Sequence, residues 1–245
     1  GVRKHLLEYD DVMNQQRQVV YDLRNQALSG DNMRETVMQI IDDYIIDEIE
    51  SQSTVGSIAD WDWDSIRNNF TTHLLVDVSY QKLINDLSKD DFSNDEIIDW
   101  ISKEAESVYK ARESLVPSEV IRGFERFVIL RTIDEKWKDH LYAMDQLREG
   151  INLRAYGQKN PLLEYKSEGF GMFQEMMKDM NAITAQRIFR TQLQGMEQAP
   201  TILSSGVKNV KVEHQETTSM GFSRQPQENS NASQKRLTSP VTADK

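Results

Sequence analysis

The chain has 245 residues, of which 28% are charged and 38% hydrophobic, and it carries a formal net charge of −11. The absence of cysteine excludes a disulfide framework and a cysteine-based zinc site, and the acidic charge argues against a nucleic-acid binder, which needs a basic surface. Apolar runs reach only four residues, against the roughly 20 of a membrane span, and no signal-peptide pattern opens the sequence. We therefore expect a soluble chain with at most peripheral membrane contact.

The first segment, residues 2–28, has apolar side chains at helical spacing and is followed by Gly30, which is placed to end a helix. No capping residue precedes this pattern, so we expect the helix to continue upstream in a longer protein. Within it, residues 8–11 (Glu-Tyr-Asp-Asp) gather three carboxylates in one turn. Spacing favours a solvated helix face, and the alternative is a polar contact to a partner domain.

The net negative charge comes from residues 33–116, which hold 19 acidic and 7 basic residues. The pattern predicts helices over 33–50, 62–72, 78–88 and 94–114, with a loop over 51–60. Asp64 is the expected cap of the second helix, and Ser93 or Asn94, with Glu96 close behind, the expected start of the last. We expect an acidic helical subdomain with a core of Trp61, Trp63, Phe70, Leu74, Leu83, Ile84, Leu87, Ile97 and Trp100.

The strongest helical signal covers residues 118–151, opened by Pro117 and Ser118. Its apolar residues recur at steps of three or four, as one face of a helix requires. They are Val120, Phe124, Phe127, Leu130, Ile133, Trp137, Leu141, Met144, Leu147 and Ile151.

A break over residues 152–159 is followed by Asn160 and Pro161, a good cap and first-turn pair, and then by a second long helical pattern that ends near Gly195. Two long helices joined by a short link must run antiparallel and bury their apolar faces on each other. The sequence therefore predicts a helical hairpin over 117–195. Its methionines at 172, 176, 177 and 180 are interpreted as core rather than as a binding surface.

The predicted tip of this hairpin is basic and aromatic, because Tyr156 lies between Arg154 and Lys159 with Gln158 beside it. Two interpretations remain open on spacing alone. The tyrosine either folds back on the hairpin end or forms an exposed contact point.

Chemical motifs are scarce. No glycine opens a phosphate-binding loop, so nucleotide hydrolysis by this chain alone is not expected. Residues 60–64 alternate Asp and Trp, but Ser65 and Thr71 stand where a calcium loop needs glycine and glutamate. The scattered histidines are interpreted as surface or packing residues rather than ligands or bases; they are His5, His73, His140 and His214. We expect no catalytic, cofactor or metal site in this chain.

Two long blocks carry a family resemblance. Residues 3–17 (RKHLLEYDDVMNQQR) resemble the central scaffold helix of the SecA family of preprotein-export motors, and residues 134–165, with LRAYGQKNP at 153–161, resemble its two-helix finger. The resemblance implies a helical scaffold over 1–30, a helical wing over 31–116, the two-helix finger over 117–195 and a C-terminal linker over 196–245. The wing has little motif similarity of its own, so its assignment rests on position.

The resemblance also implies function. In this family the finger enters the cytoplasmic mouth of the SecY channel, touches the unfolded preprotein and restrains the ATPase. Tyr156 matches the tip tyrosine that contacts substrate, with Arg154, Gln158 and Lys159 around it. ATP and Mg²⁺ would be bound by motor domains that lie upstream in the family. The Cys-rich zinc motif that binds the chaperone SecB and anionic lipid in many members has no counterpart here. The implied location is the cytoplasm, peripheral to the inner membrane.

We therefore predict an all-α chain with a long scaffold helix, an acidic wing, a long antiparallel hairpin and a mostly disordered tail over 196–245. Its predicted role is the mechanical part of an export motor. The alternative is a stand-alone helical adaptor without motor activity. A hydrolase is disfavoured, because no nucleophile, base and orienting group can be assembled from the sequence.

Overall fold

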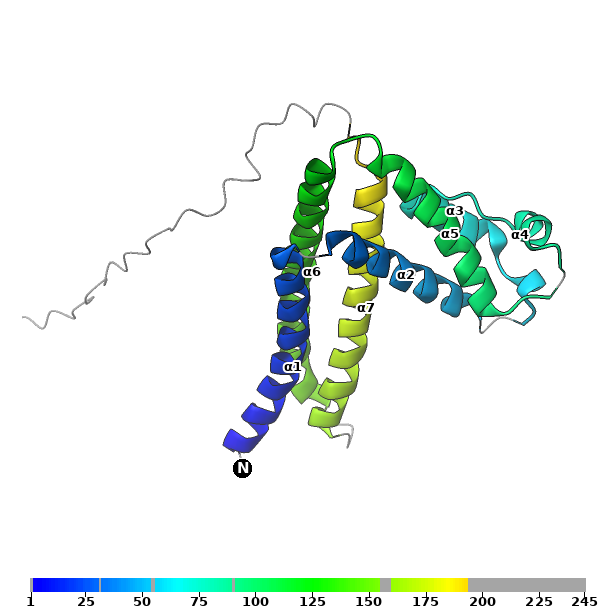
Figure 1. Ribbon diagram of the computed structural model, residues 1–245. Helices are drawn as coiled ribbons and strands as arrows, with labels where there is room; N and C mark the ends of the chain where they lie inside the picture. The colour runs from blue at the N-terminus through cyan, green and yellow to red at the C-terminus, as the bar shows by residue number, and fades with distance from the viewer. Residues whose placement is uncertain (1, 31, 54–55, 90, 155–159, 194–245) are drawn as a thin grey trace, which may run out of the picture. The chain divides into compact units, whose positions relative to one another are not determined.

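The computed structural model describes residues 2–30, 32–53, 56–89, 91–154 and 160–193, without the side chains of residues 2–6 and 152–154 (Figure 1). Every regular element in these ranges is a helix, which confirms the predicted all-α class. The elements are α1 (Val2–Ser29), α2 (Met33–Gln52), the short η1 (Ile58–Asp60), α3 (Trp63–His73), α4 (Tyr80–Leu87), α5 (Asn94–Glu113), α6 (Ser118–Arg154) and α7 (Pro161–Arg190). The predicted tail over 196–245 lies outside the described residues.

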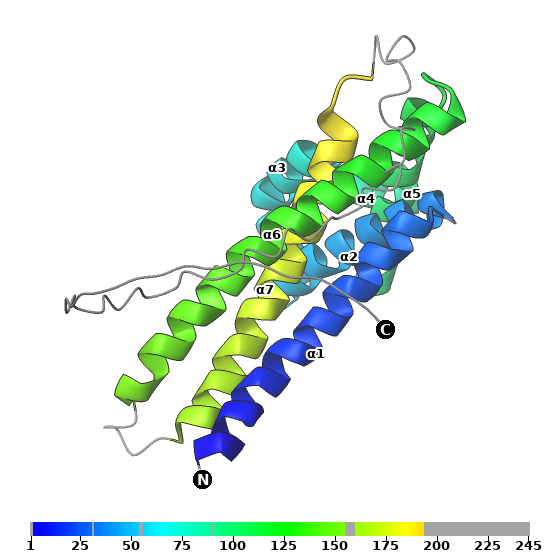
Figure 2. The same cartoon turned by 90° about the vertical axis from the view of Figure 1, so that its left-hand side faces the viewer.

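Helices α1, α6 and α7 lie side by side, as both views show (Figures 1 and 2). The contacts between α1 and α6 pair Asp10 with Arg148 and Arg24 with Asp134, so the two helices run in opposite directions. Helix α7 runs antiparallel to α6 as well. The predicted antiparallel hairpin is confirmed, and it is packed along α1.

Helices α2 to α5 form the acidic subdomain, which packs on the side of the hairpin through α2 and α3 against α7 (Figure 1). Of its predicted core, Trp63, Ile84 and Leu87 are partly buried. The other six are buried; they are Trp61, Phe70, Leu74, Leu83, Ile97 and Trp100. These side chains belong to one apolar cluster that continues into the upper part of the hairpin. The subdomain and the hairpin therefore share a core.

Local signals set most helix ends. At α5 the Ser93 side chain accepts from the Glu96 amide while Glu96 accepts from the Ser93 amide, so the predicted capping box is confirmed. At α3 the predicted cap was wrong. Asp62 has non-helical backbone angles and accepts from the Ser65 amide at 3.0 Å, whereas Asp64 lies inside the first turn. The cap is the last residue before the helical angles begin, which spacing alone placed two residues too late.

The C-terminus of α1 depends on a glycine. Gly30 has φ +68°, a conformation that L side chains rarely adopt, and a Cβ at this position would overlap the Arg126 guanidinium of α6. The residue therefore ends α1 and also allows α6 to approach it closely.

The buried face of α6 differs from the predicted one near its start. Phe127 is 54% exposed, although it was expected in the core, while Val128 and Ile129 are buried. Here α6 contacts α1, α2 and α7, so a wide face is covered. The run from Phe127 to Leu130 places apolar groups all around the helix, and the spacing rule could not tell which of them points inward. Trp137, expected in the seam, is only partly buried at the edge of the core.

Candidate functional site

The free end of the hairpin is where sequence placed the site. Helix α6 ends at Arg154, whose side chain lies outside the described residues, as do Tyr156, Gln158 and Lys159. The far side of this link is well defined. Asn160 accepts from the Leu162 amide at 3.0 Å and Pro161 takes the first helical position, so the predicted start of α7 is confirmed. A short segment therefore joins the ends of two long helices.

Next to this end of the hairpin, a small apolar cluster holds the two helices together. It consists of Met144, Leu147 and Ile151 of α6 with Tyr165 of α7. Helix α1 covers it through Tyr9, Val12 and Met13, and the rings of Tyr9 and Tyr165 meet edge to face with centroids 4.8 Å apart.

The acidic turn of α1 also contacts this end of the hairpin. Asp10 lies 3.3 Å from Arg148 of α6. The solvated-face interpretation of residues 8–11 is thus incomplete, because one of the carboxylates has a partner on another helix of this chain.

A buried polar layer crosses the bundle above the small cluster. Gln16 of α1 donates from Nε2 to the Gly169 carbonyl of α7 at 3.0 Å, and its Oε1 lies 2.9 Å from Nε2 of His140 on α6. Because the Gln16 oxygen can only accept, His140 donates and carries its proton on Nε2. Burial lowers the pKa of His140, which favours the neutral ring.

His140 is therefore a packing residue, as predicted. Its ring stacks on Trp137 and meets Phe173 edge to face, each at a centroid distance of 5.6 Å. His73 likewise has a structural role, with Nδ1 2.9 Å from the Tyr44 hydroxyl. His214 and the side chain of His5 lie outside the described residues. In the described part of the chain, no group of three or more potential metal-binding side chains occurs and no helix is long and apolar enough to cross a membrane.

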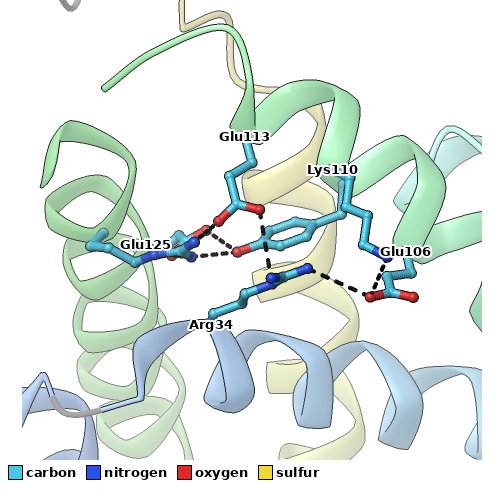
Figure 3. Close-up of polar contacts among 7 residues, drawn as sticks. Arg34, Glu106, Lys110, Glu113 and Glu125 are labelled. Carbon is cyan, nitrogen blue, oxygen red and sulfur yellow. Dashed lines mark hydrogen bonds and ion pairs between the residues drawn. The ribbon is translucent and has the colours of Figure 1, made fainter. Parts of the chain in front are cut away.

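The base of the hairpin is its end next to the acidic subdomain. A series of alternating charges joins it to that subdomain, shown in Figure 3. The series of charges begins at the surface of α5 with Lys110 and Glu106, 2.8 Å apart. Arg34 of α2 then bridges Glu106 and Glu113 of α5, at 3.5 Å and 3.8 Å. Three elements of the subdomain and hairpin are thereby linked, since Glu113 is also paired with Arg122 of α6.

The series of charges ends at a fully buried carboxylate. Glu125 of α6 is 0% exposed and accepts from Arg122 and from the Tyr109 hydroxyl, both at 2.7 Å. Burial raises its pKa in spite of these two bonds, and burial also raises the pKa of Tyr109. A buried charge of this kind is tolerated only while its partners remain in place.

A second link joins α5 to the other hairpin helix. Arg112 donates to the carbonyl oxygens of Ile188 and Thr191, at 3.0 Å and 2.6 Å. These carbonyls lie at the C-terminus of α7, where a cation also interacts favourably with the helix dipole. Helix α5 therefore contacts both helices of the hairpin at its base.

Comparison with known proteins decides the family. A family model described as the SecA wing and scaffold domain matches residues 1–192. The chain belongs to the SecA family. It is 39% identical over 207 residues to the protein translocase subunit SecA of Syntrophomonas wolfei, a match that covers 84% of this chain and 25% of that protein. The SecA of Burkholderia multivorans is 36% identical over 227 residues, covering 90% of this chain and 24% of that protein. The SecA of Solibacter usitatus is 40% identical over 192 residues, covering 78% and 19% respectively.

The chain thus spans about a quarter or less of the length of these SecA proteins. The matched range covers all the described helices, from α1 to α7, so the bundle and the acidic subdomain together constitute a SecA wing and scaffold domain. The individual boundaries at residues 30, 116 and 195 remain predictions.

Sequence reasoning missed the residues that join the parts of this domain. Gln16 and Glu125 make buried contacts, and neither was singled out. Glu125 did carry a signal, because a carboxylate next to Phe124 and one turn before Val128 and Ile129 lies on the apolar side of the predicted helix. Gln16 carried none that a single sequence could provide.

Proposed function

We propose that this chain is the mechanical part of a Sec-pathway export motor, in which the α6–α7 hairpin presents its tip to the polypeptide being moved. The observation that carries the proposal is a long antiparallel hairpin within a SecA wing and scaffold domain, in which α6 ends and α7 begins at the end away from the acidic subdomain (Figure 1). SecA relatives that contain this region are protein translocase subunits.

The proposed contact residues are Tyr156, Arg154, Gln158 and Lys159. An aromatic ring and a guanidinium can contact many different sequences, because stacking on a chain and hydrogen bonding to its backbone require no particular side chain. This property suits a motor that moves unfolded preproteins of varied composition. The same tip would meet the cytoplasmic mouth of the SecY channel.

The force would come from outside this chain. We propose that ATP and Mg²⁺ are bound by motor domains that precede it in the complete protein, that the hairpin base receives their movement, and that the finger restrains hydrolysis when the motor is idle. In the complete protein we propose a cytoplasmic location, peripheral to the inner membrane and its anionic lipids. A zinc motif that binds SecB would have to follow residue 245.

The test is Tyr156→Ala in a complete SecA that carries this chain, with preprotein transport into membrane vesicles as the readout. Transport should fall roughly tenfold or more, as for truncation of an aromatic contact residue, while nucleotide binding is retained. The matched control is Tyr142→Ala, which removes a 69% exposed tyrosine from α6 away from the tip. Normal transport by the Tyr156 variant, or equal loss in both, would refute the proposed role. The 245-residue chain alone should show no ATP hydrolysis above buffer.

A further inference from the structure

The apolar core of the hairpin is divided into two parts. The base half of the hairpin, residues 118–137 of α6 and 173–190 of α7, belongs to the large cluster shared with the acidic subdomain. The tip half, residues 144–154 and 161–172, contributes to the separate small cluster, whose buried members among the described side chains are Met144, Leu147, Ile151 and Tyr165. Packing across a helix interface provides most of its rigidity. The tip half packs in a much smaller cluster than the base half, so it is held less firmly.

The boundary between the clusters is the polar layer of Gln16, His140 and the Gly169 carbonyl. Gln16 is 7% exposed and His140 is 4% exposed, so these polar groups occupy core positions where an apolar pair would have joined the two clusters. The layer consists of two hydrogen bonds in series from α6 through α1 to α7. Such bonds fix a preferred arrangement, but they resist a change of angle less than interdigitated side chains do.

Helix α7 is intrinsically weakest at this level. Gly169 and Gly171 are separated by one residue, and each costs up to about 1 kcal/mol of helix stability relative to alanine. Gly169 has a local reason, since a Cβ there would approach Met144 Cε to 2.7 Å. Gly171 has none of this kind, because its Cβ would meet nothing within 4 Å. A glycine in open space in mid-helix adds only backbone freedom.

We infer that the hairpin contains a bend point at the Gln16–His140–Gly169 layer, about which the tip half changes its angle relative to the base half. The base half is fixed to the acidic subdomain by the shared core and by the contacts of Arg112 and Arg122, so the movement is confined to the tip half and the α1 segment that covers it. The hairpin is then a two-part lever rather than a uniformly stiff rod. The inference concerns this chain alone and does not depend on what the tip contacts.

Spin-label distance distributions test the bend, and the chain has no cysteine, so labels can be placed at chosen sites. One pair joins the halves, Phe127→Cys with Leu163→Cys, at positions that are 54% and 63% exposed. The reference pair, Phe127→Cys with Glu175→Cys, lies within the base half. The pair across the layer should give a distribution at least about twice as broad as the reference pair, because a bend adds spread only there. Equal widths would overturn the inference.

Two variants test whether the extra width of the distance distribution comes from the polar layer. Gly171→Ala, which fills open space, should narrow the distribution across the layer, whereas Gly123→Ala, an equally open glycine in the base half, should leave it unchanged. The double variant Gln16→Met with His140→Phe should also narrow it by joining the two apolar clusters, provided its helical content is that of the parent chain. If neither Gly171→Ala nor the double variant narrows the distribution, or if Gly123→Ala narrows it equally, the layer is not a bend point.

Discussion

Gln16 and His140 are 124 positions apart in the sequence, yet their side chains meet at 2.9 Å in the interior of the helical bundle. The contact joins the first helix to the hairpin at the level where the apolar core is interrupted. It lies at the level where we infer that the tip half of the hairpin bends relative to the base half.

Acidification should destabilise the chain through His140. Its pKa is lowered in the folded state, so below the unfolded value of about 6.5 the unfolded chain binds the proton more readily and stability falls with pH. Between pH 7 and 5.5, the loss from this group should reach at most about 1.4 kcal/mol. Urea unfolding at both pH values would measure it, with His140→Gln, which keeps a donor to Gln16, as the comparison. If the variant loses as much stability as the parent chain, His140 is not the cause.

The series of charges between α5 and α6 should contribute to stability mainly through its buried end. Arg122→Met leaves the buried Glu125 carboxylate without its cation and should cost about 3–5 kcal/mol of unfolding free energy. Adding Glu125→Gln should restore much of this, because the uncompensated charge is removed. Thermal or urea unfolding provides the measurement.

The control for this series of charges is Arg67→Met. Arg67 and Asp77 form an exposed pair in the acidic subdomain, so its loss should cost at most about 1 kcal/mol. A double Arg122/Glu125 variant as unstable as Arg122→Met alone would show that buried charge does not dominate the series of charges.

Alanine should have opposite effects at two glycines. Gly30→Ala forces a side chain into φ +68° and against Arg126, and should destabilise the chain by about 1–2 kcal/mol or more. Gly123→Ala fills open space inside α6 and should stabilise it by up to about 1 kcal/mol. Melting temperatures that move in the same direction for both variants would contradict the role assigned to Gly30.

Two aromatic truncations in the hairpin should differ in cost. Phe189 of α7 is fully buried in the large cluster, so Phe189→Ala should cost about 3–5 kcal/mol. Trp137 is only partly buried and stacks on His140, so Trp137→Ala should cost less, about 1–3 kcal/mol. Equilibrium unfolding of the two variants measures the difference. A larger loss for the tryptophan would place it in the seam, where spacing alone had put it.

Sequence alone determined the helices of this protein, their approximate ends and the antiparallel hairpin, because these depend on local signals. The capping box at Ser93, the cap and proline before α7 and the glycine after α1 each act within a few residues of the chain. The matching blocks over residues 3–17 and 134–165 also indicated the family, since they are long and continuous.

Only the tertiary structure decided which faces are buried and which side chains join the parts. The face of α6 that is buried near Phe127 depends on how α6 packs against α1, α2 and α7, and an apolar run with no polar side could not reveal it. Gln16 resembles an ordinary surface residue in the sequence, because its partners lie on other helices. Its burial depends on contacts between distant segments, which the spacing of residues along one helix does not encode.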